Sequence, residues 1–344
     1  MSNCFIIAEA GVNHNGSKEL ALELVDIAAK AGADAIKFQT FKADKLVRKG
    51  TEKAEYQKRE TGEGDQHSML QKLEMSEELH RELIEHCELR NIEFMSTAFD
   101  EEALDFLLLH DMKRIKIPSG EITNHAFIRF IASKNLPIIM STGMATIDEI
   151  EEAKSVIQSE RRNCAFTDPL ENILTILHCT SNYPALPEDV NLKAMNTIAE
   201  VTGMPIGYSD HTLGIAVSTG ATAMGATVIE KHFSKSRGLP GPDHKASLEP
   251  EELNELVKNI RIITKALGSS KKAPTESELP VRQLVRRSVT VDQNIKAGQL
   301  ISKEDVVLMR PGTGIFPKNL DDVIGMTAVR DISSGETLNW SDIK

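Results

Sequence analysis

This sequence is poor in cysteine, in aromatic residues and in long apolar runs, and these absences exclude several classes of protein. No apolar run approaches the roughly 20 residues that a membrane helix needs, so we expect no membrane span. The apolar stretch at 1–11 has neither a basic leader nor a small-residue cleavage pattern, which favours a cytoplasmic protein over a secreted one. The four cysteines lack close pair spacing, and we expect reduced thiols (Cys4, Cys87, Cys164 and Cys179).

Basic residues are fewer than acidic ones: the chain has 40 Lys and Arg and 51 Asp and Glu, which gives a formal net charge of -11. The sequence contains neither a basic block nor a Lys/Arg-rich amphipathic stretch, so we expect neither nucleic acid nor a membrane surface as a partner. An acidic protein that binds an anion must gather positive charge locally. Isolated Lys or Arg residues at strand ends are therefore informative.

Eight strand-like segments, each followed by a helix-like segment, alternate through most of the 344 residues. We expect strands at 5–11, 35–40, 93–99, 114–120, 137–143, 174–180, 205–211 and 227–233. The helices that follow them are expected at 18–31, 76–90, 100–110, 125–134, 146–158, 191–201, 214–224 and 250–267. Eight such units predict an α/β fold, a (β/α)₈ TIM barrel in residues 1–268. A doubly wound sheet is the competing fold, but no Gly-rich dinucleotide fingerprint follows the first strand.

The composition of the sequence changes after residue 268. Residues 269–284 are polar and rich in helix breakers, so we interpret them as a linker. Residues 285–344 have frequent Gly and Pro between short apolar segments, which predicts a small β-rich domain. About 60 residues is close to the lower limit for independent folding, so docking onto another surface would help this domain.

The active site of such a barrel lies at the carboxyl ends of its strands, and here all eight of those ends are polar. The residues are Glu9, Asn13 and His14; Lys37 and Gln39; Ser96 and Thr97; Lys116, Ser119 and Glu121; Ser141 and Thr142; His178, Thr180, Ser181 and Tyr183; Ser209, Asp210 and His211; and Glu230 and His232. Polar residues at one strand end would indicate only a turn, whereas polar residues at all eight ends predict a binding or catalytic site. Structural alternatives stay open for single residues: helix capping for Thr97 and Ser141, ion pairing within the barrel for Glu230 or Lys231, histidine orientation for Asp210, and a core position for His178.

Two of these residues are lysines expected to face inward, Lys37 and Lys116. An unpaired ammonium in a barrel interior costs several kcal/mol, on the order of magnitude known for buried charge. The two lysines therefore predict an anion between them, either the carboxylates of Glu9 and Glu121 or a bound ligand. The surrounding hydroxyls and helix N-termini favour a phosphate or a carboxylate as that ligand.

Two histidines, His211 and His232, end the neighbouring seventh and eighth strands. Imidazoles on adjacent strands can share one metal ion. With water and substrate oxygens as further ligands, such a pair suits Mn²⁺ or Mg²⁺ better than structural zinc. Spacing alone leaves this interpretation open.

Several motifs, in order along the chain, resemble the N-acetylneuraminate (sialic acid) synthase family, which includes legionaminate synthases. They are IIAEAGVNHNG at 6–16, IKFQTFKADKL at 36–46, KIPSGE at 116–121, STGMATIDEI at 141–150, HCTSNYP at 178–184, GYSDHTLG at 207–214, EKHF at 230–233 and GPDHKASLEP at 241–250. MRPGTG at 309–314 is similar to the family's C-terminal antifreeze-like (SAF) domain. The resemblance covers essentially the whole chain.

The resemblance implies roles for individual residues. His211 and His232 match the ligands of a divalent metal, Mn²⁺ first, with Mg²⁺ or Co²⁺ as alternatives. Positions that hold phosphoenolpyruvate are matched by Thr97, Lys116, Ser119, Ser141 and Ser209, and Glu9 matches the acid–base carboxylate. Positions around the sugar are matched by Lys37, Gln39, Glu121, Tyr183 and Asp243. Arg310 matches an arginine that one subunit contributes to its partner, which implies a domain-exchanged homodimer.

One position departs from the family pattern, because Ser181 stands where some members have Asn, which puts that contact in doubt. The implied reaction joins phosphoenolpyruvate to an N-acyl amino sugar by C–O cleavage. N-acetylneuraminate synthesis from N-acetylmannosamine is our main interpretation. Legionaminate synthesis from the 2,4-diacetamido-2,4,6-trideoxy sugar is the alternative, with pseudaminate synthesis less favoured. A non-catalytic carbohydrate-binding protein is the distant rival, and polar residues at eight strand ends argue against it.

Overall fold

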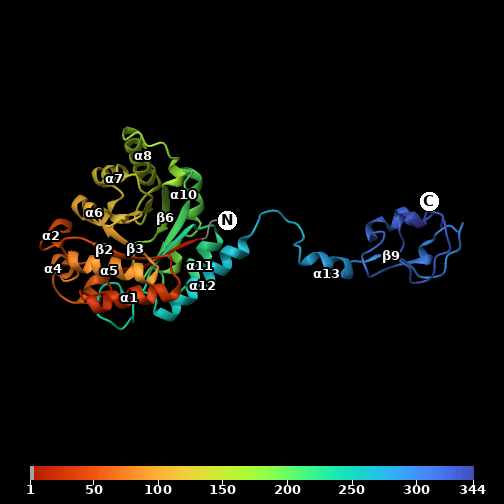
Figure 1. The fold of residues 1–344 in the computed structure, drawn as a ribbon, viewed down its shortest axis with the longest axis horizontal. Helices are drawn as coiled ribbons and strands as arrows, with labels where there is room; N and C mark the ends of the chain where they lie inside the picture. Colours follow the sequence, from red (N-terminus) through yellow and green to blue (C-terminus); the bar gives the residue numbers. More distant parts are fainter. Residues whose placement is uncertain (1–3) are drawn as a thin grey trace. The chain divides into compact units, whose positions relative to one another are not determined.

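The computed structural model describes residues 4–344, and the chain forms two compact units divided after Gly268 (Figure 1). The first unit contains every strand of the larger sheet, and the second contains a small sheet of its own. Within the described range, no helix combines the length and the apolar character needed to cross a membrane.

Eight parallel strands form the first unit. They are β1 (Phe5–Gly11), β2 (Ala35–Thr40), β3 (Glu93–Ala98), β4 (Ile115–Ile117), β5 (Ile138–Ser141), β6 (Leu174–Cys179), β7 (Ile206–Asp210) and β8 (Val228–His232). Their order in the sheet is β3-β2-β1-β8-β7-β6-β5-β4, and β3 and β4 at its two ends contact each other. The sheet therefore curves round into a barrel, which confirms the predicted fold.

The helices that follow the strands cover the outside of the sheet. They are α1 (Lys18–Ala31), α5 (Glu77–Arg90), α6 (Glu101–Leu108), α7 (His125–Ala132), α8 (Ile147–Asn163), α10 (Ala194–Thr202), α11 (Ala216–Ala223) and α12 (Pro250–Leu267). Five of them begin where a polar side chain accepts a backbone N–H of the first turn, namely Ser17, Ser76, Asp100, Asn124 and Thr146.

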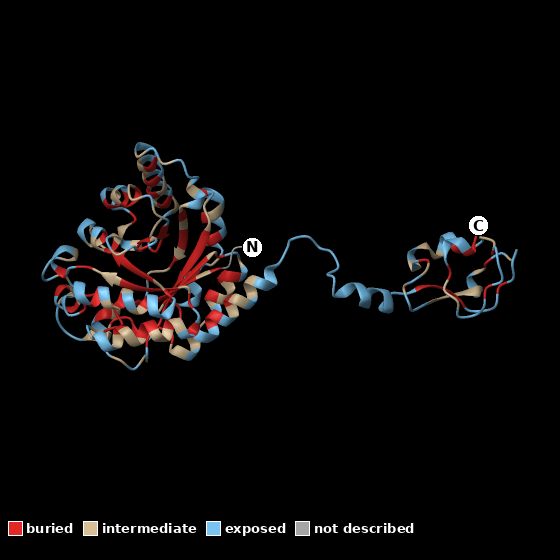
Figure 2. Cartoon of the chain, in the orientation of Figure 1, coloured by how far each residue is buried: buried red, intermediate tan, exposed pale blue. Residues whose placement is uncertain are grey.

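The inside of the barrel has two layers because strand residues two apart share a face. The lower layer is apolar and consists of Ile7, Ala35, Met95, Ile139, Leu177 and Val228. Two residues further along each of these strands stands a polar or ionisable side chain: Glu9, Lys37, Thr97, Ser141, Cys179 and Glu230. Figure 2 shows the strands buried along their length. The apolar layer fills the barrel toward the amino ends of the strands. The polar layer lies toward their carboxyl ends and contains the candidate site.

Three short helices occupy the segment between β2 and α5, where the sequence indicated only a polar stretch. They are α2 (Ala43–Leu46), α3 (Glu55–Thr61) and α4 (Gln66–Gln71). Asp65 begins α4 by accepting the backbone N–H of Ser68 at 2.9 Å. Of these helices, α3 and α4 contribute residues to the cavity at the carboxyl ends of the strands.

The second unit has an antiparallel pair of strands, β9 (Ser288–Val291) and β10 (Val306–Met309), and several isolated bridges. Short helical segments, η4 (Lys303–Asp305), η5 (Pro317–Asn319), α14 (Leu320–Val323) and η6 (Trp340–Asp342), join them. Its own core is apolar and includes Val289, Ile301 and Leu338. Helix α13 (Glu278–Val285) occupies the end of the expected linker, and Figure 2 shows it exposed.

Candidate active site

A cavity of about 510 Å³ opens within the polar layer of the barrel. Of the strand-end residues predicted from the sequence, thirteen line it: Glu9, Lys37, Gln39, Thr97, Lys116, Ser119, Ser141, Ser181, Tyr183, Ser209, His211, Glu230 and His232. They come from all eight strands or from the loops directly after them. The expected convergence of the strand ends is therefore present in the structure.

Buried ion pairs connect the two inward lysines. Lys37 Nζ lies 2.7 Å from Glu9 Oε2 and 3.6 Å from Glu230 Oε2. Lys116 Nζ lies 3.6 Å from Glu230 Oε1. Glu230 is thus shared by both lysines, and Ser209 Oγ also donates to it at 3.1 Å. The expectation that Glu9 and Glu121 pair with the lysines is confirmed for Glu9, whereas Glu230 occupies the place expected for Glu121.

Glu121 does not line this cavity, contrary to our expectation that its carboxylate would lie between the lysines. It ends a short 3₁₀ segment, η1 (Ser119–Glu121), beyond the carboxyl end of β4, where Asn124 Nδ2 donates to it at 2.7 Å. Glu230 fills the place because it stands two residues before His232 on β8 and faces the same side. Five residues beyond Lys116, the chain has already left the strand.

The two carboxylates have opposite pKa shifts. Burial raises the pKa of Glu9 to about 7, although Lys37 opposes that shift. Burial acts in the same direction on Glu230, but Lys116 and Lys37 outweigh it and lower its pKa to about 2. Two similar groups whose pKa values are driven apart in this way can act as an acid–base residue and a permanent anion. Glu9 is the group able to exchange a proton near neutral pH.

Hydroxyl groups surround the Lys116 ammonium. Lys116 Nζ donates to Ser141 Oγ at 2.7 Å, and the backbone N–H of Gly143 donates to Ser119 Oγ at 2.9 Å. A Cβ at Gly143 would lie 2.1 Å from Ser181 Oγ, so only glycine lets the two serines approach this loop. Ammonium and hydroxyl donors that converge in this way form a cradle for a phosphate or carboxylate.

The capping alternatives for two hydroxyl residues are not supported. Thr97 accepts a hydrogen bond from Lys37 Nζ at 2.9 Å, and Ser141 accepts one from Lys116. The helices that follow their strands are capped by other residues, α6 by Asp100 and α8 by Thr146. Both hydroxyls are therefore free to serve the cavity.

The two histidines are close neighbours, with ring centroids 5.5 Å apart. His211 Nδ1 lies 2.8 Å from the Thr180 carbonyl and must carry its proton, which leaves Nε2 with a lone pair. His232 Nδ1 is buried without a hydrogen-bond partner in the described part of the chain. Burial and the neighbouring His211 and Lys37 lower the pKa of His232 well below its usual value, so it is neutral.

The two imidazoles can both present a ring nitrogen to a divalent metal ion. His232 is neutral, whereas burial lowers the pKa of His211 but Cys179 and the Thr180 carbonyl outweigh it and raise it, so His211 would release a proton when the ion binds. Among residues 4–344, no group of three or more His, Cys, Asp or Glu is arranged to hold such an ion. The protein would therefore supply two ligands, and water or substrate would supply the others, as Mn²⁺ and Mg²⁺ accept. The expected donor pair is in place, while the identity of the metal stays a prediction.

Residues that the sequence did not indicate cover one side of the cavity. Tyr56 on α3 stacks on Tyr183 with ring centroids 5.2 Å apart, and the Tyr183 ring lies 4.1 Å from that of His211. Gln57 and Gln66 also line the cavity. These residues lie far from any strand end in the sequence, so their spacing gives no sign of a role in the site. They also lie outside the sequence motifs that resemble the family.

Besides Glu121, the residues Asp243 and Arg310, which the resemblance assigned to the site, are absent from the cavity lining. Asp243 is buried just before η3 (His244–Ala246), and burial raises its pKa to about 6 although His211 opposes the shift. Burial raises the pKa of Tyr56 and of Tyr183, and the charge of Asp243 adds to both shifts, so Asp243 lies near the tyrosine stack. Arg310 belongs to the second unit, directly after β10. Its contribution to the barrel of a partner subunit stays a prediction.

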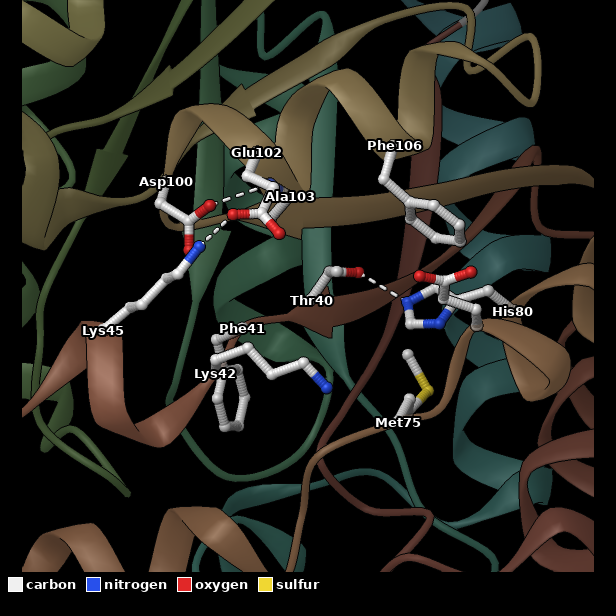
Figure 3. Close-up of a pocket in the computed structure, with 11 residues that line it drawn as sticks. Thr40, Phe41, Lys42, Lys45, Met75, His80, Asp100, Glu102, Ala103 and Phe106 are labelled. Carbon is white, nitrogen blue, oxygen red and sulfur yellow. Dashed lines mark hydrogen bonds and ion pairs between the residues drawn. The ribbon is translucent and has the colours of Figure 1, made fainter.

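A smaller cavity of about 100 Å³ lies beside β2 on the helix side (Figure 3). Its polar groups already have partners: Thr40 Oγ1 and His80 Nε2 are 2.8 Å apart, Lys45 pairs with Glu102, and Asp100 caps α6. It has about a fifth of the volume of the inner cavity and no comparable set of buried charges. The inner cavity is therefore the candidate active site.

Comparison with known proteins agrees with this geometry. The model of the NeuB family matches residues 24–272, and that of the SAF domain matches residues 286–344. The chain is 53% identical to N,N'-diacetyllegionaminic acid synthase of Legionella pneumophila over 99% of this chain and 95% of that one. The corresponding synthase of Campylobacter jejuni is 44% identical over 98% and 99%.

A solved structure is also similar. The N-acetylneuraminic acid (sialic acid) synthetase of Leptospira borgpetersenii, in complex with citrate, is 35% identical, with a TM-score of 0.71 over 81% of this chain and 90% of that one. The resemblance inferred from the sequence motifs is thereby confirmed. The chain belongs to the NeuB family, and a SAF domain follows its barrel.

Proposed function

We propose that this protein is an N,N'-diacetyllegionaminic acid synthase, which condenses phosphoenolpyruvate with 2,4-diacetamido-2,4,6-trideoxymannose and water and releases phosphate. The observation that carries the reaction class is the inner cavity, where a lysine and hydroxyl cradle lies beside carboxylates of divergent pKa. The choice of sugar rests on the two full-length relatives named for that product. These relatives favour our alternative over N-acetylneuraminate synthesis, the main interpretation from the sequence.

The cavity lining supports a sugar that is rich in amides and poor in hydroxyls. Three amide side chains reach it, Gln39, Gln57 and Gln66, and each can donate to an acetamido carbonyl. Phe99 and Met144 add apolar surface. The diacetamido sugar has two acetamido groups and a methyl group at C6, whereas N-acetylmannosamine has one acetamido group and hydroxyls at C4 and C6. The lining matches the first sugar better.

The anionic substrate is assigned to the cradle around Lys116. Phosphoenolpyruvate carries a phosphate and a carboxylate, and both need positive charge and hydrogen-bond donors in this buried cavity. Lys116, Ser119, Ser141 and the Gly143 loop supply them. Binding of a trianion would compete with Glu230 for the two lysines. Lys37 and Lys116 are therefore poised to exchange an internal carboxylate for the ligand.

In the proposed mechanism, His211 and His232 would hold the divalent ion, which supplies Lewis-acid polarisation of the sugar aldehyde. Attack by C3 of phosphoenolpyruvate on that aldehyde forms the new carbon–carbon bond and leaves positive character at C2. Glu9 takes a proton from the water that adds at C2, and the former aldehyde oxygen receives this proton and becomes a hydroxyl. The resulting tetrahedral centre expels phosphate by breaking its C–O bond while the new C2 hydroxyl gives its proton to the phosphate and becomes the ketone, and Lys37 and Lys116 stabilise the developing negative charge. The products are the 2-keto acid and phosphate.

Phosphate release tests this proposal. The full chain is incubated with phosphoenolpyruvate and either sugar, with Mn²⁺ and, separately, with EDTA. We expect metal-dependent release that is faster with the diacetamido sugar. Preference for N-acetylmannosamine would reinstate N-acetylneuraminate synthesis, and absence of release with both sugars would leave a non-catalytic carbohydrate-binding role. Mg²⁺ and Co²⁺ in place of Mn²⁺ rank the metals.

A further inference from the structure

A buried ion pair lies directly behind the two histidines, and the proposed reaction does not use it. Asp210 precedes His211 at the end of β7, and Lys231 precedes His232 on β8. Successive strand residues point to opposite faces, so this pair lies on the outside of the barrel wall. Lys231 Nζ is 2.9 Å from Asp210 Oδ2, and the side chains are 1% and 0% exposed.

Both members of the pair have further partners. Asp210 Oδ1 accepts the backbone N–H and the hydroxyl of Thr212, each at 2.8 Å, and Oδ2 accepts Ser218 Oγ of α11 at 2.5 Å. Lys231 Nζ also donates to the Thr212 carbonyl at 2.5 Å. The pair therefore joins the end of β7, the loop after it, α11 and β8 in one network.

This network brackets His211. The residue before it, Asp210, and the residue after it, Thr212, are both bound to the same ammonium of Lys231, whose chain neighbour is His232. The β7–β8 ladder ends at the register pair of Asp210 and Lys231, so His211 already lies beyond the sheet. On the side of β6, His211 is held by the backbone N–H of Ala185, which donates to its carbonyl at 2.9 Å, and by the Thr180 carbonyl. The network ties the same residue to β8 and therefore to His232.

A contribution to folding stability does not explain why this pair is buried. Withdrawing two charges from water costs several kcal/mol each, and replacing a buried pair by apolar residues of similar volume is often neutral or stabilising. The geometry supplies another role, because a metal that takes only two protein ligands depends on their separation. Outer partners of metal ligands contribute about 10- to 100-fold to metal affinity in other proteins.

We propose that Asp210 and Lys231 are positioning residues that fix the separation of His211 and His232 and thereby set the affinity for the divalent ion. They act through the backbone at the two strand ends and touch neither substrate. The inference rests on the metal-dependent function proposed above.

The test uses the full chain carrying Asp210→Asn together with Lys231→Met. Removing both charges at once avoids an unpaired buried charge, so we expect a folded protein with nearly unchanged thermal stability. The dissociation constant of Mn²⁺, measured from the paramagnetic resonance signal of the free ion, should rise about tenfold or more. His211→Ala gives the value expected when a ligand is lost. Ser218→Ala, which removes one hydrogen bond to Asp210 and leaves both charges paired, serves if the double variant does not fold.

A matched control removes an ion pair from the opposite end of the barrel. Arg114 Nε lies 2.6 Å from Glu93 Oε1 and joins the starts of β3 and β4. Arg114→Met with Glu93→Gln should leave Mn²⁺ affinity unchanged. A folded Asp210→Asn/Lys231→Met protein that binds Mn²⁺ as the wild type does would overturn the inference. Phosphate release by the wild type, followed in parallel, tests the proposed function separately.

Discussion

The two units of the chain differ in the chemistry that their side chains offer. All ten histidines, all four cysteines and all three tyrosines lie before residue 269, whereas the single tryptophan, Trp340, lies after it. The second unit has 11 basic and 10 acidic residues, which leaves 29 basic and 41 acidic residues for the barrel. The barrel thus carries all of the chain's imidazoles and thiols and all of its excess negative charge, because 29 basic and 41 acidic residues give -12 whereas 11 basic and 10 acidic residues give +1.

Burial sharpens this difference. The barrel buries charged side chains around its cavity, among them Glu9, Lys37, Lys116 and Glu230, whereas Asp342 is the charged residue buried among residues 288–344 of the second unit. Buried charge destabilises a fold unless it is paired, so its concentration in one place indicates function rather than stability. The difference places the candidate active site in the barrel, while a contribution of Arg310 stays a prediction.

The largest effect is expected from Glu9→Gln. The amide keeps the size of the side chain but takes no proton from water, so phosphate release should fall about 10³-fold, within the range of general acid–base catalysis. Binding of phosphoenolpyruvate, measured by calorimetry, should change little. Glu336→Gln in the second unit is the matched control and should retain full activity. A Glu9→Gln enzyme with near-normal rate would show that another group is the base.

The strand ends were predictable because residues two apart on a strand share a face. An apolar residue such as Ile139 followed two positions later by Ser141 therefore marks the inner side of a strand in the sequence itself. The partners across the barrel were not predictable in the same way. Whether Lys116 meets Glu121 or Glu230 depends on closure of the sheet and on the residue at which each strand ends, and both are non-local properties.

The residues of α3 and α4 show a second limit of sequence reasoning. Tyr56 and Gln66 reach the cavity because the segment between β2 and α5 folds back over the strand ends. The segment is polar and shows no regular period, so the sequence indicated only a connection. Its contribution to the site comes from tertiary packing, such as the stacking of Tyr56 on Tyr183.

The next largest effect concerns stability and tests whether the units unfold separately. Ile301 is 1% exposed in the core of the second unit, and Ile139 is 3% exposed in the lower layer of the barrel. Each isoleucine-to-alanine change should cost about 2–5 kcal/mol in its own unit. Trp340 fluorescence should report only Ile301→Ala, and loss of barrel helicity should report only Ile139→Ala. Transitions that move together in both variants would contradict independent unfolding.

A smaller effect is expected where α4 meets the cavity. Gln66→Leu keeps the bulk of the side chain and removes the amide, so the KM for the diacetamido sugar should rise about tenfold, the value of one hydrogen bond. The KM for phosphoenolpyruvate should stay constant because its cradle lies around Lys116. Gln71→Leu, at the exposed end of the same helix, is the control. Equal changes in both KM values would place Gln66 outside the sugar site.

The smallest effect is the response of the two units to acid, measured without metal. Burial lowers the pKa of His14 and of His244 to about 4. In the unfolded chain these histidines take up protons near pH 6.5, so between pH 6.5 and 4 the unfolded state binds more protons and the barrel loses stability. The loss is on the order of 1 kcal/mol per histidine by pH 5.5. The second unit has no histidine, and its carboxylates with lowered pKa values, such as Glu336 and Asp342, lose their contribution only toward pH 4, so its Trp340 transition should not change between pH 6.5 and 5.5.

Two carboxyl groups in the barrel act in the opposite direction. Burial raises the pKa of Glu9 to about 7 and that of Asp243 to about 6, so between pH 7 and 4.5 the folded barrel binds these protons first and gains stability as the pH falls. Glu9→Gln removes one of these gains. The variant barrel should therefore lose stability more steeply than the wild type between pH 7 and 5, as followed by circular dichroism at fixed denaturant. Because the same substitution is expected to slow phosphate release, a steeper acid response would link the proton that Glu9 exchanges to the burial that raises its pKa. An unchanged response would show that Glu9 is already ionised at neutral pH.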